Sequence, residues 1–297
     1  MTNRGYVTAA YGHKVYLEQA LCLLLSYRFQ KDETPFTLVT DEVLAKLCSE
    51  LNYNKWFDKI IILGNNQLHH FEGKLHAALQ TPYSDTIYFD SDCLLIKEPE
   101  TLWKELSLSS FCVPGGIYTG GSYANINMTE WLKHNQIAYL PVFNAGVFRF
   151  NNEGKKIVSE ALSIIHEHET YRLPSADGGL NEQVALGIAM AKNSIMPLSY
   201  YNDLHFSFFN ARSILKLDLY NKICKFKKER TWREPFIFHY TPLYKAGYYY
   251  SRSRKILERE LNKLRSHFGI QKIEFFKPVL RDKLALIKRG RFLIDGR

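Results

Sequence analysis

Two aspartates separated by one residue follow a short apolar run, and together they could hold a divalent cation. Asp90-Ser91-Asp92 comes directly after the apolar residues 87–89, which are typical of a buried strand that ends here. Side chains two residues apart on an extended chain point to the same side, so both carboxylates face one place. Carboxylate oxygens suit Mg²⁺ or Mn²⁺, and these ions hold the phosphates of substrates. Because the chain contains 11 Asp, such a pair also arises by chance, and the surrounding elements must support the assignment.

The first 96 residues alternate between strand-like and helix-like patterns, which places the aspartate pair at the edge of a sheet. Strands are predicted at 5–10, 36–40, 60–63 and 86–89, and helices at 13–29, 42–51 and 71–80. This alternation predicts an α/β fold whose central sheet is mostly parallel, with a Rossmann-like N-terminal half. Ligands of such sheets gather at the carboxyl ends of the strands, which is where Asp90 and Asp92 lie.

The remaining chain is less regular. Residues 113–139 are rich in Gly, Asn and Tyr, as expected of loops that bind a substrate. Residues 143–150 are predicted to form one strand, and 155–169 and 181–191 are predicted to form helices. From Ser251 onward the pattern is basic and helical, with one apolar face formed by Leu257, Leu261, Leu264 and Phe268.

Cysteine usage and charge narrow the class of protein. The five Cys are scattered without any CxxC pair, so neither a disulfide framework nor a zinc site is predicted. No signal peptide or membrane span is recognised, and we expect a cytoplasmic protein.

The positive charge is concentrated at the end of the chain. Residues 251–297 carry 14 Lys or Arg against 5 Asp or Glu, and this difference equals the whole net charge of +9. A neutral body with a basic tail predicts no nucleic acid partner, and favours either an anionic membrane surface or a solvated helix.

The neighbours of the aspartate pair make it more specific. Lys74-Leu75-His76 stands in the helix before it, Tyr88 and Phe89 precede it, and Leu102-Trp103 follows. This segment, 74–102, resembles the donor site of glycosyltransferase family 8, in which a helical Lys is followed by Y-x-D-x-D and an L-F or L-W step.

Three later segments extend the resemblance over residues 5 to about 250. Residues 143–148, FNAGVF, are similar to the family's F-N-[SA]-G-V strand, and Asp177-Gly178-Gly179 with Glu182-Gln183 is similar to a lengthened D-G-G-D-Q. His239 to Lys245 resembles the family's H-x-x-G-x-x-K, except that Pro242 replaces Gly and has no amide N–H for phosphate.

The resemblance implies a GT-A-like domain over 1–250, with a nucleotide-binding half (1–100), an acceptor and sugar-binding half (101–250), and the basic tail 251–297. It implies that Asp90, Asp92 and His239 hold Mn²⁺ or Mg²⁺. The donor, a UDP-sugar, would also be contacted by Lys74, Ser91, Pro242 and Lys245. The residues implied to bind the sugar and take part in its transfer are Asn144, Asp177, Glu182 and Gln183. Ala9, Tyr11 and Asp41, at two strand ends, are placed to bind the nucleoside, with Tyr11 stacking on the base.

The expected reaction is transfer of a hexose to a hydroxyl with retention of configuration. A cation and Lys245 would neutralise the departing diphosphate, and no side chain stands out as a covalent nucleophile. The acceptor is expected to be a saccharide or a lipid-linked saccharide of polysaccharide biosynthesis, reached from the cytosolic membrane face through the interleaved apolar and basic residues of the tail.

Two other functions remain open at this point. A phosphohydrolase of the haloacid dehalogenase kind also uses Asp-x-Asp, but Leu94 stands where Thr or Val is usual. A non-catalytic module that binds sugar or a partner is the third hypothesis, and the joint presence of Asp90, Asp92, His239 and Lys245 argues against it. Each motif also has a purely structural interpretation: a turn for the Asp pair and Asn144, a core histidine for His239, and a solvated helix residue for Lys74.

Overall fold

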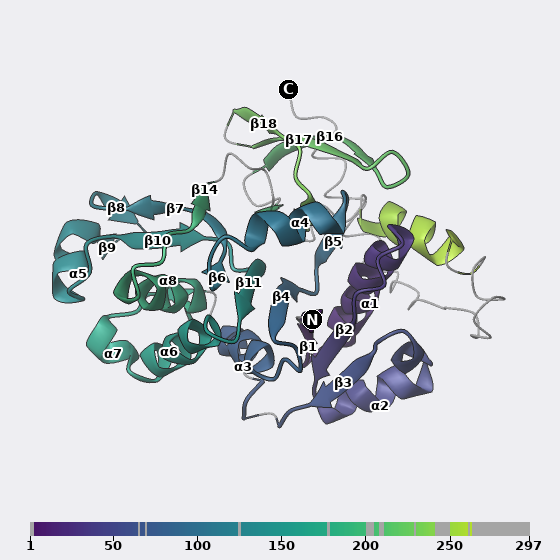
Figure 1. The fold of residues 1–297 in the computed structure, drawn as a ribbon, viewed down its shortest axis with the longest axis horizontal. Coiled ribbons are helices and arrows are strands. Elements are labelled where there is room, and N and C mark those ends of the chain that lie inside the picture. The colour runs from purple at the N-terminus through teal and green to yellow at the C-terminus, as the bar shows by residue number, and fades with distance from the viewer. Residues whose placement is uncertain are drawn as a thin grey trace.

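The computed structural model describes residues 3–64, 66–68, 70–123, 126–176, 179–199, 205–207, 211–228, 230–240, 250–260 and 262. Asp177, Pro242 and Lys245 of the predicted site, and residues 263–297 of the predicted tail, lie outside these ranges. Figure 1 shows helices on both sides of a central sheet, with a second group of strands and helices beside it.

A six-stranded sheet forms the centre of the fold, in the order β3-β2-β1-β4-β11-β6. Its strands are β1 (Arg4–Ala10), β2 (Phe36–Thr40), β3 (Lys59–Ile62), β4 (Asp85–Asp90), β6 (Phe111–Cys112) and β11 (Val147–Asn151). The first four run parallel to one another, whereas β11 runs antiparallel to both β4 and β6. The prediction of an α/β fold with a mostly parallel central sheet is therefore confirmed.

The crossovers between the parallel strands are helical, as their apolar periodicity predicts. They are α1 (Lys14–Phe29), α2 (Glu42–Glu50) with the 3₁₀ turn η1 (Tyr53–Lys55), and α3 (Gly73–Leu79) preceded by η2 (His70–Glu72). Helix α1 is buried almost all round from Leu17 to Tyr27. A helix with so little polar surface needs cover on two sides; it packs on the sheet on one side and on the helix at 250–260 on the other (Figure 1).

A second layer lies beside the edge of the sheet at β11 and β6. It contains the sheet β10-β7-β14, formed by β7 (Pro114–Tyr118), β10 (Leu140–Phe143) and β14 (Leu198–Ser199), with α6 (Lys155–His166) and α8 (Glu182–Lys192) packed together. The smaller elements are α4 (Pro99–Leu106), β8 (Ser122–Tyr123), β9 (Ile126–Asn127), α5 (Met128–His134), α7 (His168–Tyr171), β12 (Ser175–Ala176) and β13 (Gly179–Leu180).

One prediction for this region is wrong. Residues 143–150 do not form one strand, because Asn144 to Gly146 make a turn between β10 and β11. The Asn144 carboxamide accepts a hydrogen bond from the Gly146 amide, and this local bond replaces the ladder of a continuous strand. The two strands then enter different sheets, which puts the turn between the two layers.

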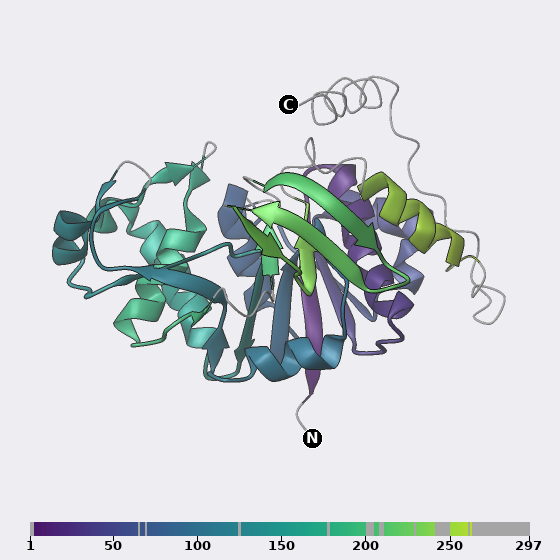
Figure 2. The same cartoon turned by 90° about the horizontal axis from the view of Figure 1, so that it is seen from above.

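The last described strands form two further sheets. A three-stranded sheet, β15-β19-β5, joins β5 (Cys93–Leu95) to β15 (His205–Ser207) and β19 (Ile237–His239), with β19 antiparallel to β5. A separate antiparallel sheet of β16 (Ala211–Asp218), β17 (Ile223–Lys228) and β18 (Thr231–Arg233) lies above it (Figure 2).

The helix at 250–260 begins where the basic tail was predicted to begin, and it is packed into the body of the protein. Leu257 is fully buried in the core beside α1, and the rings of Tyr250 and Tyr240 meet edge to face with centroids 5.0 Å apart. Arg254 forms a buried ion pair with Glu18 of α1. Among the described residues, no helix is both long and apolar enough to span a bilayer.

Candidate metal centre

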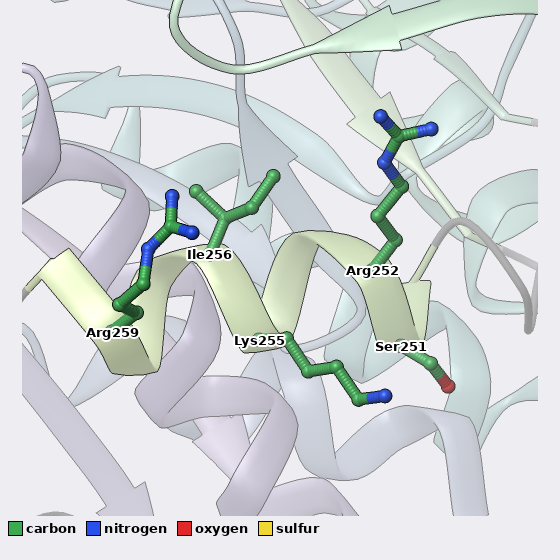
Figure 3. Close-up of a pocket in the computed structure, with 5 residues that line it drawn as sticks. All are labelled: Ser251, Arg252, Lys255, Ile256 and Arg259. Atoms are coloured by element: carbon green, nitrogen blue, oxygen red, sulfur yellow. The ribbon is translucent and has the colours of Figure 1, made fainter.

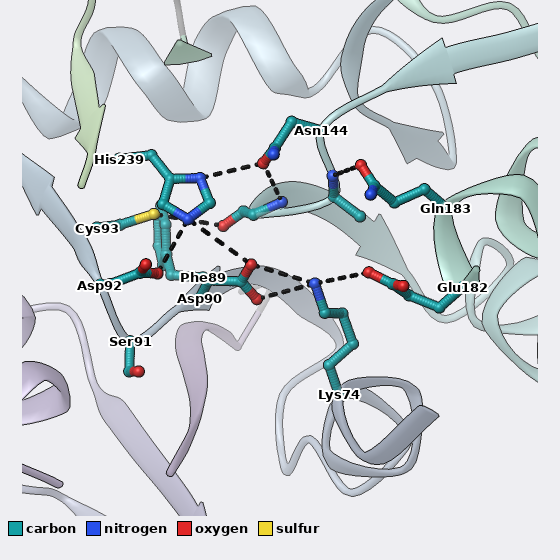
Figure 4. Close-up of polar contacts among 12 residues, drawn as sticks. Lys74, Phe89, Asp90, Ser91, Asp92, Cys93, Asn144, Glu182, Gln183 and His239 are labelled. Atoms are coloured by element: carbon teal, nitrogen blue, oxygen red, sulfur yellow. Dashed lines mark hydrogen bonds and ion pairs between the residues drawn. The ribbon is translucent and has the colours of Figure 1, made fainter. Parts of the chain in front are cut away.

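The aspartate pair lies at the carboxyl end of β4, as the sequence predicts, and strand pairing brings a histidine to it. Asp90 is the last residue of β4, and Asp92 stands just before β5. In the antiparallel pair of β5 and β19, His239 is opposite Cys93, and the Tyr240 amide donates to the Asp92 carbonyl over 2.9 Å. The backbone therefore fixes His239 beside the pair although it is far away in the sequence (Figure 4).

The imidazole of His239 is held in one orientation. Its Nδ1 lies 3.1 Å from Asn144 Oδ1, which also accepts from the Gly146 amide over 2.9 Å. A carboxamide oxygen can only accept hydrogen bonds, as it does from the Gly146 amide. Nδ1 is therefore the donor in its hydrogen bond with Asn144 Oδ1, and it carries the proton. Nε2 then faces the carboxylates, 2.9 Å from Asp92 Oδ1 and 3.9 Å from Asp90 Oδ2.

His239 is 2% exposed, and opposing effects act on it. Burial disfavours the charged imidazolium, but the carboxylates of Asp92 and Asp90 outweigh this and raise the pKa of His239. A neutral imidazole would direct the lone pair of Nε2 at a carboxylate oxygen, which is repulsive. A proton or a metal cation at this position removes the repulsion. A positive charge between Nε2 and Asp92 is therefore favourable.

A buried lysine joins Asp90 to a residue from the second layer. Nζ of Lys74, on α3, lies 3.1 Å from both carboxylate oxygens of Asp90 and 3.0 Å from Oε1 of Glu182. Burial would lower the pKa of Lys74, but the two carboxylates raise it above its ordinary value, so the ammonium form is kept. Glu182 is the first residue of α8, where a negative charge is also favourable to the helix dipole.

The turn between β10 and β11 holds the site together. The Gly146 carbonyl accepts from the Asp90 amide over 2.8 Å, and Gln183 Oε1 accepts from the Ala145 amide over 3.1 Å. A Cβ on Gly146 would lie 2.6 Å from two atoms of the His239 ring, so only glycine permits this approach. Gly146 was predicted to lie within a strand, and a glycine inside an apolar strand pattern is itself a signal of close backbone approach.

Cys93 is a further residue that the sequence analysis missed. Its Sγ is buried and donates to the Gly146 carbonyl over 3.6 Å. Burial, with the nearby carboxylates of Asp92 and Asp90, raises the pKa of this thiol well above its ordinary value. Ligand atoms of Asp92, Cys93 and His239 all lie within 4.8 Å of one another, yet a lone Cys after an Asp-x-Asp carries no recognised metal-ligand spacing in the sequence.

The predicted nucleoside contacts lie at the same edge of the sheet. Ala9, near the end of β1, is paired with Asp90, and Tyr11 packs against Gly73 at the start of α3. Asp41 has a structural role, because its carboxylate caps α2 through the Leu44 amide and accepts from the Gly12 amide over 2.7 Å. Their contacts with a nucleoside stay predictions.

Most of the predicted site residues that the structure describes lie close together, whereas Ser91 points away from them. Seven of them converge from helices, strands and turns that are far apart in the sequence (Figure 4): Lys74, Asp90, Asp92, Asn144, Glu182, Gln183 and His239. The Ser91 hydroxyl instead points toward α1, where Gln19 Oε1 lies 3.5 Å away.

The charge and chemistry of this cluster fit a divalent cation. Asp90, Asp92 and Glu182 bring three carboxylates to one place, and Lys74 pairs with two of them, Asp90 and Glu182. Carboxylates gathered at a partly buried site are costly unless cations neutralise them. Asp90, Asp92 and His239 would hold the divalent cation, and their oxygen and nitrogen donors suit Mn²⁺ or Mg²⁺.

The sequence matches no protein-family model and no curated protein sequence. Among solved structures, the chain is similar to the galactosyltransferase LgtC in complex with donor and acceptor sugar analogs, with 14% identity and a TM-score of 0.47 over 69% of this chain and 76% of LgtC. It is similar to mouse xyloside xylosyltransferase 1, with 13% identity and a TM-score of 0.46 over 69% of this chain and 87% of that chain.

A third similar structure is the glycosyltransferase GlyE of Streptococcus pneumoniae TIGR4, with 19% identity and a TM-score of 0.45 over 69% of this chain. The match spans only 47% of GlyE. All three are glycosyltransferases by name, and similarity at these levels leaves the activity of this chain to be argued from its site.

Proposed function

We propose that the protein is a metal-dependent glycosyltransferase whose donor is a nucleoside-diphosphate sugar. One observation carries the proposal: Asp90, Asp92 and His239 meet at the carboxyl end of β4, where Nε2 of the imidazole faces both carboxylates. These three residues would hold a divalent cation, which would supply positive charge for binding the phosphates of a donor. The phosphohydrolase hypothesis is less suitable, because Leu94 stands where Thr or Val is usual after the Asp pair.

The bound cation would act as a Lewis acid for the departing diphosphate. The protein's own residues would orient the reactants around it. Lys74 keeps the carboxylates of Asp90 and Glu182 ionised and in place, and the Asn144 carboxamide keeps Nε2 of His239 available as a ligand. The turn at 144–146, fixed by Gln183, would contact the sugar of the donor.

For the reaction we propose transfer of a hexose, from UDP, to a hydroxyl with retention of configuration. Glu182 is a poor covalent nucleophile, because Oε1 is paired with Lys74 and the side chain is 4% exposed. We therefore favour departure of the diphosphate from the same face on which the acceptor hydroxyl attacks, with the leaving phosphate accepting the proton. The roles of Asp177, Pro242 and Lys245 are part of this proposal and come from the resemblance alone.

The test is release of UDP by purified protein from UDP-glucose, UDP-galactose and their N-acetyl forms, with Mn²⁺ or with a chelator. We expect release from one of them that depends on Mn²⁺ and is lost in Asp92→Asn. The proposal fails if none is turned over and Asp92→Asn binds metal and nucleotide like the wild type. Calorimetric binding of a sugar that needs neither Mn²⁺ nor nucleotide would favour the non-catalytic binding module instead.

For the acceptor we propose an anionic, lipid-linked saccharide at a membrane surface, on the basis of the basic tail. The described part of that tail carries a cavity of about 400 Å³ lined by Ser251, Arg252, Lys255, Ile256 and Arg259 (Figure 3). Arg252 and Arg259 lie on the same side of the helix as Ile256 (Figure 3), and cations beside an apolar side chain suit a phosphate next to an acyl or isoprenoid chain.

Flotation with liposomes of anionic and of neutral lipid tests the membrane proposal. The full chain is compared with a chain that ends at Asn262, since ending it at Tyr250 would remove the buried Leu257 and the Arg254 pair. We expect the full chain to float with anionic liposomes only, and Arg252→Glu with Lys255→Glu to weaken this. Equal flotation of the full chain with neutral liposomes would contradict the proposal.

A further inference from the structure

We propose that Asp92, Cys93 and His239 form a second ligand set at the metal centre, which takes a thiophilic divalent cation such as Zn²⁺ in place of the hard ion. The proposal rests on the positions of three ligand atoms and does not require the transferase activity proposed above. Its new element is the sulfur of Cys93, the first residue of β5.

The backbone brings the three ligands together without help from a metal. Cys93 and His239 are opposite each other in the pairing of β5 with β19, and Asp92 precedes Cys93 in the chain. One ligand atom from each residue lies within 4.8 Å of the others, and Asp92 Oδ1 is 2.9 Å from His239 Nε2. Around tetrahedral Zn²⁺, ligand atoms are separated by about 3.5 Å, so small side-chain rotations complete the set.

A second observation points independently to a metal. Nδ1 of His239 donates to Asn144 Oδ1, and this oxygen is itself fixed by the Gly146 amide. Histidines that bind metals usually donate their other ring N–H to such an acceptor, because this fixes the tautomer and the direction of the ligating nitrogen. Nε2 is thereby directed to the side on which both Asp92 and Cys93 lie (Figure 4).

Asp90 and Cys93 stand on different sides of this shared pair of ligands. Both oxygens of Asp90 contact Lys74, so a metal that uses Asp90 competes with an ammonium group for it. Cys93 donates its thiol proton to the Gly146 carbonyl, and ligation would break that weak bond and release the proton to solvent. A hard ion gains more from the carboxylate of Asp90, and a thiophilic ion gains more from the sulfur.

The consequence is competition between two kinds of cation at one place. Both sets need Asp92 and His239, so the two ions cannot be bound together. We expect Zn²⁺ to displace Mn²⁺ from the centre through Cys93, and the identity of the bound ion to depend on which metal is available.

Cobalt provides the test, because a thiolate bound to Co²⁺ gives an intense charge-transfer absorption that oxygen and nitrogen ligands do not give. The full chain is titrated with Co²⁺ as wild type, Cys93→Ser and Cys93→Ala. Alanine is included because a buried serine hydroxyl carries a desolvation cost of its own. Cys112→Ser is the matched control, since Cys112 is equally buried but lies on β6. Circular dichroism of each variant without metal confirms the fold.

We expect the charge-transfer band in the wild type and in Cys112→Ser, saturating at one equivalent, and its loss in both Cys93 variants. Zn²⁺ affinity, from competition with a chromophoric chelator, should fall at least about 100-fold in Cys93→Ser, the upper end for loss of a supporting residue. Mn²⁺ affinity should change by less than about threefold, because Mn²⁺ prefers oxygen and nitrogen.

A band that persists in Cys93→Ser, no band in the wild type, or equal losses of affinity for Zn²⁺ and Mn²⁺ would overturn the inference. None of these outcomes affects Mn²⁺-dependent release of UDP by the wild type, so this inference and the proposed function can fail separately.

Discussion

Asp90 and Asp92 are two residues apart in the chain, but their carboxylates have different surroundings. We name the two groups the lysine side (Lys74, Asp90 and Glu182) and the histidine side (Asp92, Cys93 and His239). On the lysine side a buried ammonium lies about equally close to two carboxylates, at 3.0 and 3.1 Å. On the histidine side the charge of Asp92 faces an imidazole whose other nitrogen is committed to Asn144.

The difference indicates that the two groups of residues have different roles at the site. The lysine side carries its own counter-charge, so it can be formed before any ligand arrives and can join the two layers of the fold. The histidine side is completed by a proton or a metal cation, so its electrostatic state depends on what is bound. Four substitutions test this division, from the largest expected effect to the smallest.

Lys74→Met should be the most damaging change, because it leaves Asp90 and Glu182 as like charges at a buried position. Removal of one partner of a buried ion pair costs about 3–5 kcal/mol, and we expect the free energy of unfolding in urea to fall by that amount. Added Mn²⁺ should restore part of the loss. Lys192→Met, which removes a mostly exposed lysine near Glu160, is the control and should cost under about 1 kcal/mol. Equal stability of Lys74→Met and wild type would show that the lysine side does not join the layers.

Asp92→Asn should act on metal binding and leave the fold intact. The change removes one ligand charge, and we expect Mn²⁺ affinity to fall by at least about 100-fold, or about 2.8 kcal/mol. Stability without metal should stay equal or rise, because one of three neighbouring carboxylates at a partly buried site loses its charge. Calorimetric titration with Mn²⁺ measures the first effect and urea unfolding the second. If affinity is unchanged, the histidine side is not the metal centre.

Gly146→Ala tests whether the turn sets the position of His239. A Cβ at this residue would meet Cε1 and Nδ1 of the ring at 2.6 Å, so the imidazole must move away from the carboxylates. We expect a loss of stability of about 1–3 kcal/mol, typical of overpacking, together with weaker Mn²⁺ binding. Gly120→Ala is the control, because its nearest contact is the Thr129 hydroxyl, away from the site. Unchanged metal affinity in Gly146→Ala would mean that His239 does not need this position.

Asn144→Ala should have the smallest effect, because it removes a group that acts only through His239 and Gly146. We expect Mn²⁺ affinity to fall about tenfold, the lower end for a partner that orients a metal ligand. Asn144→Asp keeps an oxygen acceptor for Nδ1 and should recover most of the affinity. If alanine and aspartate behave alike, the carboxamide does not orient the imidazole.

Local patterns determined a large part of this protein. Every predicted strand and helix up to residue 96 is found, because the burial of each element leaves its own periodicity in neighbouring residues. The position of Asp90 and Asp92 follows in the same way, since a strand end can be read from where an apolar run stops. The two helices of the second half, α6 and α8, were predictable for the same reason.

Only the tertiary structure decided how distant residues meet. The pairing of β19 with β5 puts His239 opposite Cys93, and nothing in either short strand specifies its partner. The turn at Asn144 to Gly146 was hidden, because its side-chain hydrogen bond interrupts a pattern that otherwise reads as a continuous strand. The resemblance named Lys74 and Glu182 separately, but their ion pair depends on packing α3 and α8 against the same strand end. The residue types of the site are thus local information, whereas the charge balance that gives the site its chemistry arises from contacts between segments that the chain keeps far apart.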